Sequence, residues 1–285
     1  MAALALMTTS CGGADPAGVK PPDPARAHHV VTYHDVTIEV VAEGAGPPLL
    51  LLPSLGRDSY DYDEVAAGLA ANGFRVLRPQ PRGIGRSTGP TANLTLHDFA
   101  RDIAAVIERE NAGPAVIVGH AYGHWVARMT AADHPHLVRG VVVAAGAARR
   151  YPDSLSALVT VAADPARPDP ERLRALQAAF FAPGNDPTEW LEGWHPEVRK
   201  IQMEASDRTD KDSWWLTAPS PILDLQAGDD PWRPKSTATE LKDQFGDRVT
   251  ITAIPGASHS LFPEQPRAVV DAITTWARQL QPASR

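Results

Sequence analysis

Cysteine is almost absent from this sequence, because Cys11 is the one cysteine among 285 residues. An internal disulfide and a metal site built from cysteines are therefore excluded. The sequence also lacks a basic run, and its formal net charge of -7 is spread along the chain, so nothing in the charge indicates a nucleic acid or an anionic membrane surface as a partner. No stretch of ~18 apolar residues predicts a membrane-spanning helix.

The single cysteine has a setting that allows two interpretations. The run "ALALMTTSCGGADPAG" leads through small residues to Cys11 and resembles the end of a bacterial lipoprotein signal, which predicts an extracytoplasmic protein tethered to a membrane through lipidated Cys11. Against this, no Lys or Arg precedes the apolar run, and Thr8 stands where Leu or Val is usual. The alternative is a cytoplasmic protein whose N-terminal cysteine has no function. In both cases residues 1–29 are predicted to be a leader and a Pro-rich linker.

From residue 30 onward, short apolar runs alternate with amphipathic helical stretches, and 43% of all residues are hydrophobic. This alternation predicts an α/β fold with a mostly parallel sheet flanked by helices. The predicted strands are residues 36–44, 47–53, 74–80, 114–121, 139–146, 221–228 and 248–256. We expect the first of them to be an edge strand.

One segment interrupts the alternation. Residues 148–218 are rich in Pro, Asp, Arg and aromatic residues and include Trp190, Trp194, Trp214 and Trp215. An insertion at this place is expected to form a helical cap over the carboxyl ends of the strands, where open α/β sheets bind ligands. Two roles for these tryptophans remain open: they line a pocket, or they attach the cap to the body.

A turn between a strand and a helix lacks its expected nucleophile. The stretch "VGHAYGHW" (118–125) has the G-x-S-x-G form of a nucleophile elbow, but Ala121 occupies the serine position. Gly119 and Gly123 retain the small residues that such a strained turn needs. Ala121 therefore removes a hydroxyl from a turn that is otherwise intact.

The order of motifs resembles the α/β-hydrolase superfamily from about residue 30 to residue 280. A strand ending in "RPQPRGIGRS" (78–87) matches the family's D-x-R-G-x-G-x-S element at Arg82, Gly83, Gly85 and Ser87, and it precedes the elbow and the cap. The resemblance implies a hydrolase core at 30–147 and 219–285 with the cap between these segments.

The resemblance also assigns roles to residues after the late strands. "AGDDPWRP" (227–234) implies Asp230 as the catalytic acid, with Asp229 as the alternative, and "PGASHSLFPEQP" (255–266) implies His259 as the base. A carboxylate that accepts from one imidazole nitrogen leaves the other nitrogen free to take a proton. The predicted chemistry needs no cofactor and no metal.

The backbone N–H groups of Leu55 and Tyr122 are the expected oxyanion donors. In "LPSLGRDS" (52–59), Pro53 and Ser54 replace the family's His-Gly pair, which is a second departure in the same site. Ser54 and His120 are assigned to the pocket, although a structural role for His120 is the default.

Two explanations of Ala121 remain open: an engineered Ser-to-Ala change, or natural divergence. The paired change at Pro53 and Ser54 favours divergence, and the motif series is similar to that of a bacterial subgroup whose elbow reads Gly-His-Ala-aromatic-Gly.

Three functions are compatible with these motifs. The His259–Asp230 pair could activate water to hydrolyse an ester, lactone or similar acyl bond in a hydrophobic small molecule. The same base could deprotonate an acidic substrate in lyase or cofactor-free oxygenase chemistry, or the protein could be a binding protein without catalysis. Ser54 as a substitute nucleophile is a fourth, weaker alternative. The sequence does not predict an oligomeric state.

Overall fold

The computed structural model describes residues 26–217 and 219–280. Cys11 and nearly all of the predicted leader and linker lie outside the described residues. Within the described part of the chain, no helix is both long enough and apolar enough to cross a membrane.

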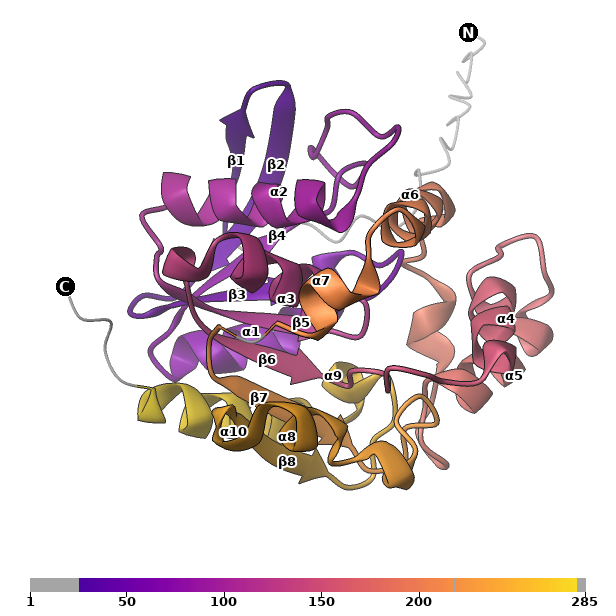
Figure 1. Cartoon of the computed structure of the whole chain (residues 1–285). Helices are drawn as coiled ribbons and strands as arrows, with labels where there is room; N and C mark the ends of the chain where they lie inside the picture. Colours follow the sequence, from indigo (N-terminus) through magenta and orange to yellow (C-terminus); the bar gives the residue numbers. More distant parts are fainter. Residues whose placement is uncertain (1–25, 218, 281–285) are drawn as a thin grey trace, which may run out of the picture.

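Eight strands form one sheet in the order β1-β2-β4-β3-β5-β6-β7-β8 (Figure 1). The strands are β1 (Ala27–Tyr33), β2 (Val36–Glu43), β3 (Pro48–Leu52), β4 (Arg75–Pro79), β5 (Ala115–His120), β6 (Val138–Ala144), β7 (Ile222–Ala227) and β8 (Val249–Ile254). β2 pairs antiparallel with β1 and β4, and the remaining pairs are parallel. The predicted fold class is confirmed, and all seven predicted strands are present.

The first strand was not predicted. β1 begins within the stretch assigned to the linker and pairs along its whole length with β2, so the strand predicted at 36–44 is the second strand and not the edge. Only Val31 in β1 is buried, while the other side chains are half-buried or exposed. An exposed edge strand has no apolar run or clear alternation by which the sequence could reveal it.

Helices cover both faces of the sheet. Helices α1 (Asp63–Ala71) and α10 (Pro266–Gln279) pack on one face, and α2 (Leu96–Arg109) and α3 (Gly123–Asp133) pack on the other. Successive leucines of β3 alternate between the two cores, since Leu49 and Leu51 join the first and Leu50 and Leu52 join the second. This is the expected period of two for a strand buried on both faces. The short helices α8 (Glu240–Phe245) and α9 (Leu261–Glu264) complete the body.

The segment between β6 and β7 forms four helices, α4 (Asp153–Ala162), α5 (Asp169–Ala179), α6 (Pro196–Asp207) and α7 (Lys211–Trp215). Figure 1 shows α4 and α5 projecting from the body, and they share a small apolar cluster with Trp190 and Trp232. By contrast, α7 packs on the body, where the Trp214 ring stacks on the Trp125 ring of α3 at 5.4 Å. Helix α6 also reaches the body core, through Ala205. We refer to α4, α5 and α6 together as the cap.

The turn from β5 into α3 depends on two glycines at close backbone contacts. A Cβ at Gly119 would lie 2.4 Å from the carbonyl of Gly123, and a Cβ at Gly123 would lie 2.5 Å from the Leu52 carbonyl oxygen. Between them the backbone of Ala121 has a φ of +46°, a conformation that L-residues other than glycine rarely adopt. Packing against β3 thus forces the strained turn.

We expect Gly119→Ala to destabilise the fold strongly, because the added methyl group would overlap backbone that cannot move away. Overpacking of this kind costs about 3 kcal/mol of unfolding free energy. The control is Gly184→Ala, since no atom lies within 4 Å of the added Cβ there; the φ of Gly184 is +93°, unlike that of Gly119, so this variant should lose only about 1 kcal/mol, from backbone strain and not from close contact. Urea unfolding measures both. Equal losses would contradict the close-contact explanation.

Candidate active site

The predicted site residues meet at the carboxyl ends of the central strands. Ala121 follows β5, Asp230 follows β7, His259 follows β8, and Leu55 follows β3. Parallel strands bring their carboxyl ends to one edge of the sheet, so segments distant in the sequence converge there.

His259 and Asp230 form a buried pair. The Nδ1 atom of His259 lies 2.9 Å from Oδ2 of Asp230, and the other carboxylate oxygen of Asp230 accepts from the Trp232 N–H at 2.8 Å. A carboxylate only accepts, so the proton of a neutral His259 is on Nδ1 and Nε2 carries the lone pair. Asp229, the alternative acid, is exposed, and its backbone N–H instead donates to the Ala257 carbonyl. The geometry assigns the acid position to Asp230.

Aromatic packing holds the imidazole of His259 in place. The Trp232 ring stacks on it with centroids 5.0 Å apart and an interplanar angle of 25°, and the Phe180 ring lies at 5.7 Å. Both the backbone N–H and the hydroxyl of Ser260 donate to the Phe180 carbonyl at 2.8 Å. The loop that carries His259 is therefore fixed from both the body and the cap.

Two backbone N–H groups are available at the predicted oxyanion position. Among the described residues, neither the Leu55 N–H nor the Tyr122 N–H has a hydrogen-bond acceptor, whereas the neighbouring N–H groups of Ser54 and Gly56 do. Leu55, Tyr122 and His259 all line one cavity. Unpaired N–H groups beside a base are the donors that a developing oxyanion requires.

The cap holds the loop that carries Leu55. The Gly56 N–H donates to Oε1 of Gln202 on α6 at 2.7 Å, and the Gly56 carbonyl accepts from the His195 N–H at 2.8 Å. The imidazole of His195 also lies 3.2 Å from the Asp58 carboxylate. The conformation of this loop thus depends on groups about 140 residues further along the chain.

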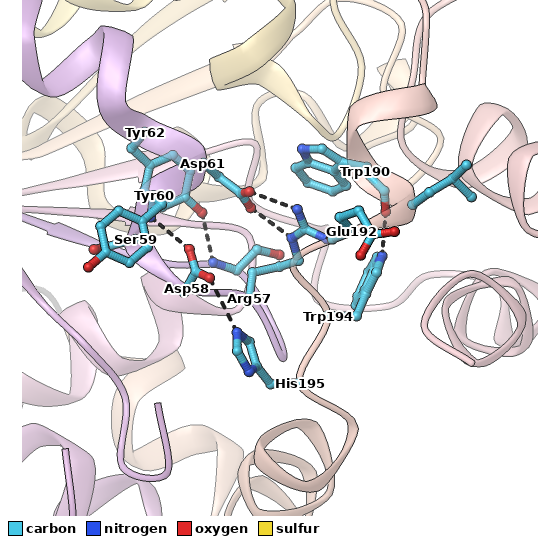
Figure 2. Close-up of polar contacts among 12 residues, drawn as sticks. Arg57, Asp58, Ser59, Tyr60, Asp61, Tyr62, Trp190, Glu192, Trp194 and His195 are labelled. Carbon is cyan, nitrogen blue, oxygen red and sulfur yellow. Dashed lines mark hydrogen bonds and ion pairs between the residues drawn. The ribbon is translucent and has the colours of Figure 1, made fainter. Parts of the chain in front are cut away.

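Arg57 is the centre of this attachment. Its side chain is only 1% exposed, and its guanidinium binds Asp61 in bidentate fashion at 2.7 Å and donates to the Glu192 carbonyl at 2.6 Å. Figure 2 shows the same guanidinium between the indole rings of Trp190 and Trp194, whose centroids lie 4.6 and 4.8 Å away. A planar cation that combines two carboxylate bonds with two aromatic contacts is a strong fixed point.

His120 connects three loops below the cavity. The Ser54 N–H donates to the Tyr62 hydroxyl at 2.8 Å, this hydroxyl donates to Nδ1 of His120 at 2.9 Å, and Nε2 of His120 donates to the His259 carbonyl at 2.7 Å. The two ends of this chain of bonds fix the direction of the bond between them, because a backbone N–H can only donate and a carbonyl can only accept. Complete burial lowers the pKa of His120 to about 3, so the imidazole stays neutral.

The cavity beside His259 is mainly apolar. Its lining consists of Ser54, Leu55, Ala121, Tyr122, Trp125, Ala147, Tyr151, Ser156, Val159, Phe180, Arg199, Met203, Trp232 and His259. Ser54 therefore lies where the sequence placed it, whereas fully buried His120 lies behind the lining. Trp125 and Trp232 were not predicted to line the cavity, although each follows a predicted site residue within four positions.

None of the four tryptophans of residues 148–218 that were assigned to the pocket lines the cavity. Trp190 and Trp194 contact Arg57, while Trp214 and Trp215 flank the buried guanidinium of Arg128 at 5.5 and 4.9 Å. The pocket prediction for these residues is corrected by the structure, which gives them the attaching role. The physical reason is that each indole ring packs against an arginine whose position only the fold determines.

The residues that the structure describes contain no cluster of three or more His, Cys, Asp or Glu side chains able to hold a metal ion. The chemistry available from the described side chains is that of a base oriented by a carboxylate, beside two N–H donors.

We expect the free energy of unfolding to decrease as the pH is lowered, because of the titration of His120. An unfolded histidine titrates near pH 6.5, so between pH 6.5 and about 3 the unfolded chain binds a proton that the folded protein does not. Acidification through this window therefore favours unfolding, by up to about 1.4 kcal/mol per pH unit.

The variant His120→Gln keeps a donor and an acceptor but does not titrate. Urea unfolding at pH 7.5 and pH 5 should show a smaller loss of stability for this variant than for the native protein. Burial also lowers the pKa of His124, but His124 is present in both proteins and cancels in the comparison. Identical pH dependence would refute the neutral assignment of His120.

A family model and several known proteins are similar to this chain. The model of the alpha/beta hydrolase family matches residues 49–272. The 2-(acetamidomethylene)succinate hydrolase of Mesorhizobium japonicum is 32% identical over 107 residues, 38% of each chain. The carbendazim hydrolyzing esterase of Nocardioides sp. is 33% identical over 105 residues, 36% of this chain and 43% of that protein. The chain thus matches about two fifths of the length of these curated relatives.

Solved structures show the same fold over most of the chain. A thermophilic esterase from Thermogutta terrifontis superposes with a TM-score of 0.72 at 22% identity, covering 90% of this chain and 99% of that chain. An esterase from Exiguobacterium antarcticum gives 0.71 at 17% identity, covering 86% and 96%. With the family match spanning most of its length, this protein belongs to the α/β-hydrolase family.

Proposed function

We propose that this protein hydrolyses an ester, lactone or similar acyl bond in a hydrophobic small molecule by activating water. The observation that carries the proposal is the His259–Asp230 pair, whose free Nε2 belongs to a side chain lining the same apolar cavity as Ala121 and the two unpaired N–H groups. Two of the relatives above, a hydrolase and an esterase, support this class of reaction.

The proposed reaction needs only groups of this chain and one water molecule. Nε2 of His259 takes a proton as the water oxygen attacks the acyl carbon, and the N–H groups of Leu55 and Tyr122 stabilise the resulting oxyanion. When the tetrahedral intermediate collapses, the leaving alkoxide takes the proton from the imidazolium. The products are a carboxylic acid and an alcohol, and no acyl-enzyme forms because a methyl group cannot attack a carbonyl.

We further infer that Ala121 is a natural feature of a subgroup in this family and not an engineered change. Two departures from the family pattern meet at the same cavity, because Ala121 and Ser54 of the Pro53-Ser54 pair both line it. In the proposed reaction, water occupies the space that a serine hydroxyl would otherwise fill.

The decisive test is turnover of 4-nitrophenyl esters and aryl lactones by the native protein and three variants. His259→Ala should lower kcat/KM by about 10²- to 10⁴-fold, the usual contribution of a general base. His97→Ala is the control, because His97 forms a similar pair with Asp133 at 2.8 Å on the surface, and it should leave kcat/KM unchanged. In Ala121→Ser, mass spectrometry should detect an acyl-enzyme that the native protein never forms.

Other outcomes would replace the proposal. Activity only in Ala121→Ser would mean that the native site lacks its nucleophile and does not activate water. Tight retention of ligand without turnover in any variant would indicate a binding protein. Turnover of a carbon acid without ester hydrolysis would indicate lyase or oxygenase chemistry by the same base.

Arg57 should position the oxyanion donor without touching substrate. Arg57→Met removes the bonds to Asp61 and Glu192 and should lower kcat by about 10- to 100-fold with little change in KM, because a misplaced donor weakens the transition state more than substrate binding. Steady-state kinetics with one ester measures both constants.

The matched control for Arg57 is Arg172→Met. Arg172 is also buried and donates to the Leu191 carbonyl next to Glu192, but its other bonds, to the Ala162 carbonyl at 3.0 Å and to the Asp169 carboxylate at 3.5 Å, lie within the cap. It should lower stability and leave kcat nearly unchanged. Equal losses of kcat in both variants would mean that Arg57 only stabilises the cap.

A further inference from the structure

The cavity beside His259 contains one fixed charge. Arg199 is the only arginine or lysine among its lining residues, and no aspartate or glutamate lines it. Most of the remaining lining is aromatic or aliphatic. An apolar cavity with a single cation is electrostatically suited to an anionic ligand group.

The guanidinium of Arg199 is incompletely bonded. One terminal nitrogen donates to the hydroxyl of Thr160 on α4 at 2.9 Å, while the buried Nε has no acceptor among the described residues. No carboxylate of residues 26–217 or 219–280 lies within ion-pair distance of Arg199. Burial lowers the pKa of Arg199, and no acidic neighbour opposes this shift. Because a guanidinium stays protonated in proteins, the side chain is still a charged donor, and its Nε is unused.

Several buried arginines have partners that half-buried Arg199 lacks. Arg57, Arg82 and Arg233 each bind an aspartate at 2.7 to 2.8 Å. Arg128 lacks a carboxylate partner but lies over the indole rings of Trp214 and Trp215. Only Arg199 among these five arginines lines the cavity that His259 lines.

The stem of Arg199 is fixed next to the catalytic machinery. Gly56 approaches so closely that an added Cβ would lie 2.7 Å from Cβ of Arg199. Gly56 is the neighbour of Leu55, the predicted oxyanion donor. A ligand whose acyl carbon meets Leu55 and His259 thus has an arginine at the wall of the same cavity.

We propose that Arg199 binds a carboxylate of the substrate, so that the substrate is a hydrophobic acyl compound carrying an anionic group away from the scissile bond. The monoesters of aliphatic dicarboxylic acids have this chemistry. The substrate carboxylate fills the donor capacity of a planar guanidinium and compensates its charge. The acyl bond that is cleaved rests on the proposed function, whereas binding of a carboxylate at Arg199 does not depend on it.

The first test compares matched substrates. Mono-4-nitrophenyl esters of adipate, suberate and sebacate carry a free carboxylate, and their methyl-capped counterparts are neutral. For at least one chain length, native protein should prefer the free acid by about 10- to 100-fold in kcat/KM, the range expected for hydrogen bonds to a charged group. In Arg199→Met this preference should vanish, while kcat/KM for the neutral ester changes less than about threefold.

Two further variants separate charge from structure. Arg199→Lys keeps the charge but loses the planar fork, and it should retain part of the preference. Arg139→Met is the matched control, because Arg139 is also half-buried with an unpaired Nε but lies at the start of β6, away from the cavity. It should keep the full preference. Equal losses for both substrates in Arg199→Met would indicate a merely structural role and overturn the inference.

A binding experiment keeps the two proposals distinguishable. Isothermal titration calorimetry with 4-phenylbutyrate and the neutral 4-phenylbutyramide requires no turnover. The native protein should bind the carboxylate at least about tenfold more tightly, and Arg199→Met should bind both alike. If the native protein prefers the carboxylate, the preference is lost in Arg199→Met and no ester is hydrolysed, the proposed function is refuted and the carboxylate site is supported. A carboxylate preference that persists in Arg199→Met would place the anion at the oxyanion donors and overturn the inference.

Discussion

The neutral imidazole of His120 is the point at which the loops of the candidate site meet. His120 is the last residue of β5. Its imidazole accepts from Tyr62 and donates to the carbonyl of His259, while Tyr62 accepts from Ser54. Because each group uses its single donor, the chain of bonds runs in one direction and fixes the oxyanion loop, the elbow and the base relative to one another. The burial that lowers the pKa of His120 is therefore a requirement of the geometry.

Ala121 changes the chemistry of the elbow but not its architecture. The positive φ is imposed by contacts of Gly119 and Gly123 with neighbouring backbone, not by the side chain at 121. A non-glycine residue in this conformation costs about 1–2 kcal/mol, and the turn keeps it although no hydroxyl is presented. What the turn still provides is the N–H of Tyr122 at the cavity, which any reaction through an oxyanion would use.

The parts predicted from sequence are those that local patterns specify. Buried strands appear in the sequence as apolar runs, so the fold could be predicted. Asp230 and His259 occupy short motifs after two of these strands, and the resemblance to the family implied their roles. β1 was missed because only Val31 in it is buried. The pocket assignment of the four tryptophans in residues 148–218 was wrong because their rings pack on arginines whose positions only the fold determines. Arg199 was missed because a single arginine on a cap helix belongs to no pattern; only its position at the cavity distinguishes it.

The cap and the oxyanion loop cannot move independently. Arg57 and Gln202 join them through buried bonds, so a cap that opened as one body would displace Leu55 and dismantle the donor pair. Between α4 and α6, in contrast, the one hydrogen bond found among the described residues is the exposed bond from Arg199 to Thr160. A substrate carboxylate bound to Arg199 would replace a neutral hydroxyl by a charged acceptor on the same guanidinium. This exchange would leave the bonds of Arg57 and Gln202, and with them the loop that carries Leu55, in place.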